Sequence, residues 1–353
     1  MQERRPSRGT RAYTSEFVAM KAAAVDSARC GIVVIGRNEG ERLRRSLTSA
    51  VASGCPVVYV DSRSTDDSVM VAKELGAEVV ELDVAAKLSA ALARHTGALA
   101  MMAAHPAVQY LQFIDGDCVL SSGWIERSVA ALDADISLVA VCGFRREAEP
   151  RRNVFHRVVS IEWQLGGVGD VDAFGGDVMI RASAYRAAGG YNPTVVAGED
   201  PDLSSRLRSG GGRLERLDGI ATTHDIAMHS VKQWWKRAER GGYGGALVAD
   251  LHRHTDRLYW HETKRSLLWG GVAPLVALVA LRFTRIPLLL VAAKYALSTV
   301  RAARGATGHD LRFIDRAAWG VSCVAAGVPG AIGAARYLLE ARRGRQPHII
   351  EYK

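Results

Sequence analysis

The chain has 353 residues, of which 48% are apolar and 24% charged, and its net charge is +9. These are the proportions of a folded protein, so the composition excludes a disordered chain. The positive charge is concentrated in residues 282–353, which hold 12 Lys or Arg against 4 Asp or Glu. Because these cations punctuate apolar stretches and do not alternate with aromatics, they indicate anionic membrane lipid as a partner and no nucleic acid.

The N-terminal segment and the cysteines suggest a cytosolic protein. Residues 1–29 contain several arginines but no apolar run, so we expect a flexible basic tail and no cleaved secretory signal. The five cysteines have no CxxC spacing and no zinc-partner histidine, so we expect reduced core residues. They are Cys30, Cys55, Cys118, Cys142 and Cys323.

Short apolar runs alternate with helical patterns from residue 30 onward. The predicted strands are 30–36, 56–61, 77–82, 110–115 and 138–144. Two helices are predicted between them, at 64–75, which has good helix-start residues and stops at Gly76, and at 84–104. This rhythm predicts an α/β fold with a Rossmann-like, mostly parallel sheet flanked by helices.

Polar side chains follow three of these strands. They are Arg37, Asn38 and Glu39 after the first strand, Asp61 and Ser64 after the second, and Asp115 and Asp117 after the fourth. Ligands of an open parallel sheet bind beyond the carboxyl ends of its strands, so these residues are candidates for a common site. The composition around Asp61 is also that of an ordinary turn.

Asp115 and Asp117 lie two apart with Gly116 between them, so both carboxylates can turn toward one point. Such a pair suits Mg²⁺ or Mn²⁺, which usually takes one or two protein carboxylates together with phosphate oxygens. The alternative is a solvated Asp-Gly-Asp turn.

Two later segments combine glycines and acids. Gly175, Gly176 and Asp177 precede an apolar run, where the glycines allow close backbone approach to a ligand or form a tight turn. Three acids, Glu199, Asp200 and Asp202, then open a helical pattern. A helix cap accounts for one of them, not for three.

Five motifs, in this order, resemble a family-2 glycosyltransferase with the GT-A fold over residues 30 to about 245. They are IGRNEGERL, VDSRSTDDS, FIDGDC, GGDVMIRASAYRAAGGYN and GEDPDLSSRLRSGG. The resemblance implies a nucleotide-diphosphate-sugar donor, a divalent metal and an inverting reaction, with Gly175, Gly176 and Asp177 on the acceptor side.

The resemblance also implies roles for single residues. Asp61 would hold the nucleobase or ribose, Asp115 would lie near the ribose or the metal, and Asp117 would ligate the metal. Asp200 would be the catalytic base that deprotonates the acceptor hydroxyl, with Glu199 orienting it.

Candidates farther along the chain carry a weaker signal. His224 is a possible metal ligand by the resemblance, although a histidine after a strand is often structural. Residues 233–237 read QWWKR and depart from the QxxRW pattern of processive relatives. Trp234 could stack on the acceptor sugar or belong to an amphipathic helix, and Arg237 and Arg240 could contact donor phosphate.

Three apolar stretches follow the catalytic domain, which we place at residues 30–263: 266–281, 286–300 and 317–339. Only the third comfortably reaches spanning length, and arginines flank all three. If all three stretches crossed the membrane, successive loops would lie on opposite sides, and some of the positive loops would lie outside the cytosol. This favours a re-entrant hairpin or interfacial helices over simple crossings. We therefore expect residues 264–353 to be an apolar, basic, helical region at the cytoplasmic face of the membrane; buried soluble helices are the alternative.

Two other functions are compatible with parts of the sequence. FIDGDCVL also fits a haloacid-dehalogenase-like phosphatase with Asp115 as nucleophile, but three strands precede it where that fold has none. A non-catalytic sugar-nucleotide-binding membrane scaffold would be free to lose Asp117 or Asp200, and both are present. Because donor contacts are shared across the family, the motifs do not identify the donor nucleotide or sugar. They also do not define the oligomeric state. A saccharide or lipid-linked acceptor is expected only by analogy with the family.

Overall fold

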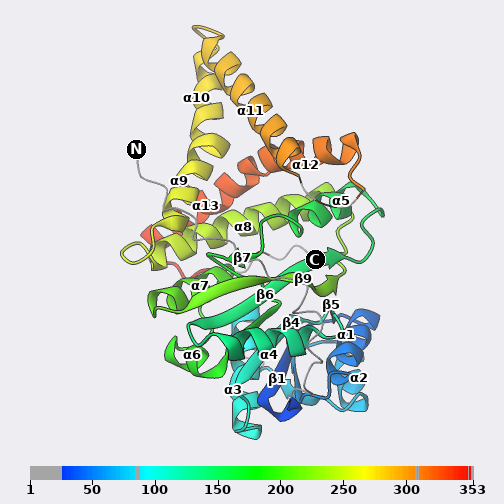
Figure 1. Cartoon of the computed structure of the whole chain (residues 1–353). Helices are drawn as coiled ribbons and strands as arrows, with labels where there is room; N and C mark the ends of the chain where they lie inside the picture. The colour runs from blue at the N-terminus through cyan, green and yellow to red at the C-terminus, as the bar shows by residue number, and fades with distance from the viewer. Residues whose placement is uncertain (1–25, 84–87, 307, 309, 349, 351–353) are drawn as a thin grey trace.

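The computed structural model describes residues 26–83, 88–306, 308, 310–348 and 350 (Figure 1). The predicted flexible tail, residues 1–29, lies outside the described residues except for its last four. There a short helical turn, η2 (Ser27–Arg29), leads into the first strand. Arg29 pairs with Asp133 at 2.7 Å, so the start of the described chain is fixed to the body.

A nine-stranded sheet forms the centre of the molecule, in the order β3-β2-β1-β4-β8-β6-β9-β5, with β7 beside β9. The strands are β1 (Cys30–Gly36), β2 (Val57–Asp61), β3 (Glu78–Glu81), β4 (Tyr110–Asp115), β5 (Cys118–Leu120), β6 (Leu138–Glu147), β7 (Gly169–Asp170), β8 (Val178–Arg181) and β9 (Arg213–His224). The predicted α/β sheet is confirmed, and its first four strands pair in parallel. Beyond β4 the sheet is mixed, because β8 runs antiparallel to both of its neighbours.

The central strands are apolar throughout because both faces of the sheet are covered. On one face Ile32 and Val34 pack with residues of α1 (Glu41–Val51) and α4 (Trp124–Ala134). On the other, Val33 packs against α3 (Ala90–Ala104), where a Cβ on Gly97 would lie 2.5 Å from Val33. This tight packing of α3 on β1 and β2 brings the inner face of α3 up to the end of the sheet.

Two predicted helices differ from the observed ones at their starts. Helix α2 (Ser68–Glu74) begins four residues later than predicted, because the Asp66 carboxylate accepts bonds from the backbone N–H groups of Gly40 and Ser68. Residues 84–87 of the predicted helix 84–104 lie outside the described residues. Helix α3 begins after Ser89, whose side chain caps the Leu92 N–H.

The chain after β6 is mainly helical, and its helices from α8 onward lie above the sheet in the view of Figure 1. Its helices are α5 (Val154–Glu162), α6 (Ala182–Ala187), α7 (Glu199–Ser209), α8 (Val231–Leu251), α9 (Leu258–Leu267), η3 (Leu268–Val272), α10 (Ala273–Ala280), α11 (Ile286–Gly305), α12 (Phe313–Ala325) and α13 (Gly327–Arg342). Helix α13 packs closely on α8, where a Cβ on Gly242 would lie 1.9 Å from the Gly330 carbonyl oxygen. The predicted domain boundary at residue 264 falls inside α9.

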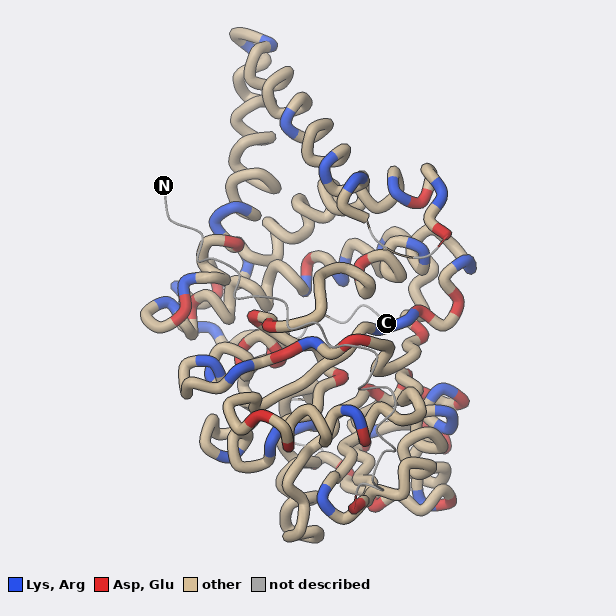
Figure 2. Tube along the Cα trace, viewed as in Figure 1, with Lys and Arg blue, Asp and Glu red and all other residues tan. Residues whose placement is uncertain are grey.

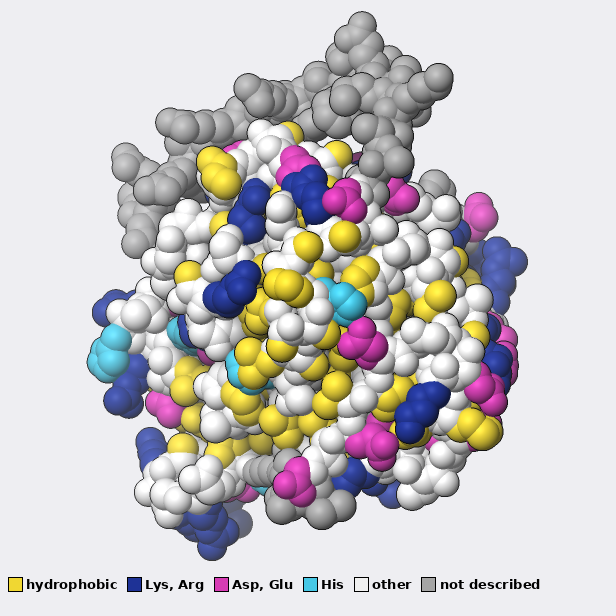
Figure 3. Space-filling model, turned by 90° about the horizontal axis from the view of Figure 1, so that it is seen from below, with side chains coloured by type: hydrophobic (Ala, Val, Ile, Leu, Met, Phe, Trp, Pro, Cys, Tyr) yellow, Lys and Arg dark blue, Asp and Glu magenta, His cyan; other side chains and the backbone are white. Residues whose placement is uncertain are grey.

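Helices α10 and α11 protrude from the body as a hairpin (Figure 1). Two helical segments of the described chain are long and apolar enough to cross a membrane, Ile286–Gly305 and Phe313–Arg342. The second contains the third predicted stretch, but it consists of α12 and α13, and α13 is partly buried against α8. The face opposite the hairpin carries charged side chains of both signs around its rim (Figure 3), in contrast to the mainly uncharged hairpin (Figure 2).

Candidate active site

The loops after β1 and β2 are joined by hydrogen bonds. The Asn38 N–H donates to Ser64 Oγ at 2.9 Å, and the Thr65 N–H donates to Asn38 Oδ1 at 2.7 Å. Asn38 has a positive φ of 55°, which turns its side chain across to the second loop. Two of the predicted donor-site residues therefore build one cradle beyond the carboxyl ends of neighbouring strands.

Asp61 lies beneath this cradle. It is 1% exposed, and its carboxylate accepts hydrogen bonds from Tyr59 Oη at 2.9 Å and from the Ser64 N–H at 2.7 Å. Arg37 is exposed at the rim, and Glu39 forms an ion pair with Arg42 at 2.8 Å. In this structure Asp61 fixes the shape of the loop; its contact with a nucleobase or ribose stays a prediction.

Arg94 connects the two acidic motifs. Its guanidinium is 3% exposed and lies 2.7 Å from Asp115 Oδ1, 2.8 Å from Glu199 Oε1 and 3.4 Å from Asp200 Oδ1. A Cβ on Gly176 would lie 2.3 Å from Arg94 Nη2 and 3.1 Å from Asp115 Oδ2. The glycine-rich segment thus leaves the space in which Arg94 holds residues from β4 and α7 together.

Sequence reasoning missed Arg94. It belongs to the predicted crossover helix, which we treated only as a connection between strands. The available signal was a single arginine within an Ala-rich helix whose inner face has to pack on a buried sheet. Since a buried cation needs carboxylate partners, this arginine could have been expected to pair with acids at the end of the sheet.

The position of Asp200 at the first turn of α7 gives it unusual acid–base properties. Tyr191 Oη donates to Asp200 Oδ1 at 2.9 Å. Burial raises the pKa of Asp200 to about 7; Arg94 opposes this rise, and the negative charges of Glu199 and Asp115 add to it. A carboxyl group with a pKa near neutrality is suited to general base catalysis.

Asp202, the third acid of the same motif, has a different environment. It pairs with Arg206 at 2.6 Å and with His252 Nε2 at 2.8 Å. These contacts tie α7 to the end of α8, so Asp202 supports the position of Asp200 and does not face the cluster around Arg94.

A candidate metal site adjoins this cluster. Strands β5 and β9 pair Cys118 with His224, and His224 Nε2 lies 3.1 Å from Asp117 Oδ1. The Asp117, Cys118 and His224 side chains are all buried, and their ligand atoms are close enough together to hold one ion.

The environment of His224 tests whether these residues fit a cation. His224 is 6% exposed, and among the described residues neither of its ring nitrogens has a hydrogen-bond partner. The Trp163 ring stacks on it with 4.6 Å between ring centroids. Because buried polar atoms are nearly always satisfied, a buried imidazole without a hydrogen bond beside a carboxylate fits a bound divalent cation.

Asp177, which we predicted on the acceptor side, lies close to Asp115 and Cys118. Arg145 donates to both of its oxygens, at 2.6 and 2.9 Å, and the Thr222 hydroxyl donates as well. A Cβ on Gly175 would lie 2.9 Å from Arg145 Nη2. Asp177 is therefore buried and paired, and its described contacts are with residues that support the site from below. Sequence motifs had indicated neither Arg145 nor Trp163.

The late candidates on α8 contact other helices. Trp234 Nε1 donates to Ser322 Oγ of α12 at 3.0 Å, and its ring packs in a cluster with Trp163. Arg237 makes two hydrogen bonds to Glu162 of α5, at 2.9 and 2.8 Å, and Arg240 lies half-buried nearly one turn farther along. The structure thus brings Trp234 toward Trp163 and His224, whereas Arg237 is paired with a carboxylate.

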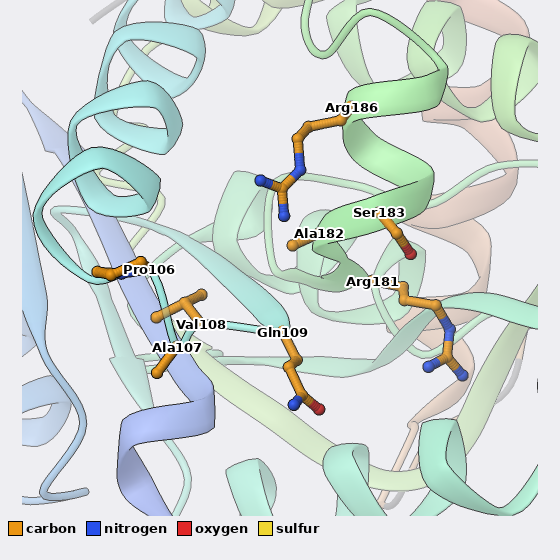
Figure 4. Close-up of a pocket in the computed structure, with 8 residues that line it drawn as sticks. All are labelled: Pro106, Ala107, Val108, Gln109, Arg181, Ala182, Ser183 and Arg186. Carbon is orange, nitrogen blue, oxygen red and sulfur yellow. The ribbon is translucent and has the colours of Figure 1, made fainter.

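A pocket of about 390 Å³ lies at the other end of β4 (Figure 4). It is lined by residues 106–109 and by residues of the β8–α6 junction, including Arg181 and Arg186. Since it adjoins the amino end of β4 and the acids follow its carboxyl end, this pocket is separate from the candidate active site.

The structure thus combines a mixed α/β sheet with an acidic pair at the end of β4, a histidine at the end of β9 and a second acidic pair at the start of α7. The family model of glycosyl transferase family 2 matches residues 31–187. The chain therefore carries a family-2 glycosyltransferase domain with the GT-A fold, and the predicted family and fold are confirmed.

Relatives agree with this assignment. The chain is 28% identical over 242 residues to the pre-mycofactocin glycosyltransferase of Mycobacterium tuberculosis, which covers 64% of this chain and 48% of that protein. It is 27% identical over 225 residues to the succinoglycan biosynthesis protein ExoA of Rhizobium meliloti, covering 61% and 65%. The chain thus spans about half the length of the first relative and under two thirds of the second.

A solved structure shows the same fold over most of the chain. It is the mannosyltransferase PcManGT from Pyrobaculum calidifontis in complex with GDP-Man and Mn²⁺, with a TM-score of 0.60, 16% identity and 87% of each chain covered. At this identity the likeness establishes the fold alone.

Proposed function

We propose that this protein is an inverting, divalent-metal-dependent hexosyltransferase that moves a sugar from a nucleotide-diphosphate sugar to a saccharide or lipid-linked acceptor. The observation that carries the proposal is the position of Arg94 between Asp115, Glu199 and Asp200. Arg94 connects Asp115, which is proposed to lie beside the metal, with Asp200, whose pKa of about 7 suits a general base.

On the donor side, the residues of this chain bind and orient. The Asn38–Ser64 cradle above Asp61 would receive the nucleoside, and Asp117 with His224 would hold the cation, with Asp115 beside it. A bound Mg²⁺ or Mn²⁺ supplies charge neutralisation for the leaving diphosphate. The Mn²⁺ and GDP-Man in PcManGT support this choice of donor class and metal.

On the acceptor side, Asp200 accepts the proton. The acceptor hydroxyl oxygen attacks the anomeric carbon, the bond from that carbon to the diphosphate oxygen breaks, and the hydroxyl proton passes to Asp200. Glu199 and Arg94 hold Asp200 in position through the ion pairs described above. Attack from the face opposite the leaving group inverts the anomeric configuration.

We also propose that residues 264–353 hold the enzyme at the cytoplasmic face of a membrane, in contact with anionic lipid. Two apolar helical segments and the arginines around them support this location. The succinoglycan biosynthesis protein among the relatives supports a role in making a cell-envelope polysaccharide. A lipid-linked acceptor would be delivered at this surface.

The test is calorimetric titration of the purified protein with UDP, GDP and dTDP, each with and without Mn²⁺. Binding of one nucleotide that depends on Mn²⁺ is the expected result, and it would also identify the donor base. Failure of all three to bind would contradict the proposed donor site and favour the Asp115 phosphatase.

A further inference from the structure

The α10–α11 hairpin exposes apolar side chains without any covering element in the described chain. In α10, Leu275, Val276, Leu278 and Val279 are each more than half exposed, whereas Ala277 is 1% exposed. At 100° per residue these four positions span about 160° of the helix surface on the side opposite Ala277, and α10, with the sequence APLVALVA, has no polar side chain on any side. The hairpin is therefore apolar on every outward side of α10, which an interfacial helix with one wet face would not be.

Lys294 lies near the middle of α11, and its polar contacts are made within the hairpin. Lys294 of α11 donates to Ser298 Oγ at 2.6 Å, one turn closer to the body, and its ammonium lies 5.0 Å from the centroid of the Trp269 ring. The Tyr295 hydroxyl donates to the Trp269 carbonyl oxygen. A charged side chain within a membrane-spanning hairpin is expected to be held in this way, by polar and aromatic groups of the hairpin itself.

The far end of the hairpin is cationic. Its tip is the sequence Arg282-Phe283-Thr284-Arg285, in which Phe283 is 84% exposed (Figure 2). If the hairpin ended inside one leaflet, both arginines would lie near the middle of the hydrocarbon, where a charged side chain is costly. The tip therefore favours a position at a second headgroup layer.

The length of α11 fits that distance. Its 20 residues extend about 30 Å, which is the thickness of a hydrocarbon core. Arg285 precedes its first residue, and Arg301 and Arg304 lie in its last turns. The part between these arginines, residues 286–300, has Lys294 as its one charged residue and extends about 22 Å, and arginine side chains can reach the remaining distance to the headgroups.

The distribution of charge sets the orientation. Residues 263–309 contain no Asp or Glu. Besides Lys294 within α11, four cations lie at the body end of the hairpin and two at the tip; the four are Lys264, Arg265, Arg301 and Arg304. The more cationic end stays in the cytosol, which places the catalytic domain there. Helix α13 packs against α8, so the third apolar stretch does not cross the bilayer. With two crossings only, the arginine-flanked stretches no longer require an odd number of changes of side.

We infer that the α10–α11 hairpin crosses the bilayer twice, with Lys264, Arg265, Arg301 and Arg304 at the cytoplasmic interface and Arg282 and Arg285 in the opposite headgroup layer. This inference rests on the proposed membrane location and adds its topology. The partner is a lipid bilayer with anionic headgroups on the cytoplasmic side.

The experiment uses single cysteines at the two ends of the hairpin. Cys323 is exposed, whereas the other four cysteines are buried, so Cys323→Ser gives a background of low reactivity. Thr284→Cys reports on the tip, with Phe283→Cys as a second tip variant, and Arg304→Cys reports on the body end. Each full-length variant is expressed in bacteria and exposed to a membrane-impermeant maleimide in spheroplasts and in inverted membrane vesicles.

The inference predicts labelling of the tip in spheroplasts and of Arg304→Cys in inverted vesicles, with each position protected in the other preparation until detergent is added. Protection of the tip in both preparations would place it inside the bilayer, and tip labelling in inverted vesicles would leave it on the cytoplasmic side. Either result overturns the crossing while keeping membrane association. Recovery of the protein in the soluble fraction would instead contradict the proposed membrane location itself.

Discussion

Two parts of this molecule treat charge in opposite ways. In the candidate active site, carboxylates from β4 and α7 converge on the buried guanidinium of Arg94. In the hairpin, cations are confined to the ends and to Lys294, and the apolar side chains between them face outward. The first arrangement is stable because opposite charges compensate each other out of water, whereas the second is suited to a surrounding without water.

The largest effect is expected from Asp200→Asn, which removes the proposed base and keeps the shape of the side chain. Sugar transfer should fall by about 10² to 10⁴-fold, the usual contribution of a general base. Transfer rates measured at saturating donor check this, with Asp202→Asn as a control for damage to α7. Transfer that stays near the wild-type rate would exclude Asp200 as the base.

Replacing Arg94 tests whether the cluster depends on charge compensation. Arg94→Met leaves three carboxylates around a cavity without a cation, so we expect a loss of about 3–5 kcal/mol in the free energy of unfolding. Because Arg94 lowers the pKa of Asp200, the same change should move the midpoint of the pH–rate profile to higher pH.

Urea unfolding and pH–rate profiles of Arg94→Met and Arg94→Lys measure the two effects of Arg94. The lysine variant keeps the charge and should lie between wild type and Arg94→Met in both. If the methionine variant matches wild type in stability and in midpoint, Arg94 has no compensating role.

The hairpin side of the comparison is tested by adding charge to its apolar surface. Leu278→Asp and Leu289→Asp should each weaken membrane association by about 2.5–3.5 kcal/mol. Leu251→Asp, at an equally exposed leucine at the end of α8, is the matched control and should have no effect. Flotation of each variant with anionic vesicles gives the comparison, and an equal loss in all three would point to general misfolding.

The smallest effects concern pH. Because Asp200 has to be deprotonated to act as a base, kcat/KM should rise with pH through about 7. Since its pKa is raised above the unfolded value of about 3.9, its contribution to stability is greatest below about pH 4 and is lost as pH rises to about 7.

Asp200→Asn removes that contribution to the pH dependence. The variant should therefore have a higher Tm than wild type above pH 7, and the difference should shrink toward pH 4. Thermal unfolding across this range measures it, and a variant less stable than wild type at pH 8 would contradict the direction of the pKa shift.

The sheet could be predicted from the sequence because its signal is local. The bounds of β1 and β4 coincide with the predictions, since strands buried on both faces are continuous apolar runs ended by polar residues. The starts of α2 and of the antiparallel strands beyond β4 depend on contacts between distant segments, such as Asp66 with Gly40.

The site could be predicted only in part for the same reason. Asp115, Glu199 and Asp200 lie in acidic motifs, but nothing local showed that they share a buried cation. Arg94 belongs to a segment that sequence reasoning treated as an ordinary helix, and Arg145 and Trp163 lie outside the predicted elements. Only the packing of α3, β6 and α5 brings the three residues to the site. The apolar stretch 317–339 met the length criterion for a span, yet α13 packs against α8.

The central claim is that one set of residues binds the metal and donor while another removes the acceptor proton. Calorimetry of the preferred nucleotide with Mn²⁺, on wild type, Asp117→Asn and Asp200→Asn side by side, tests it most directly. The account predicts that Asp117→Asn loses the Mn²⁺-dependent binding and that Asp200→Asn keeps it while losing transfer. Equal, mild effects of the two changes on binding and transfer would contradict this division.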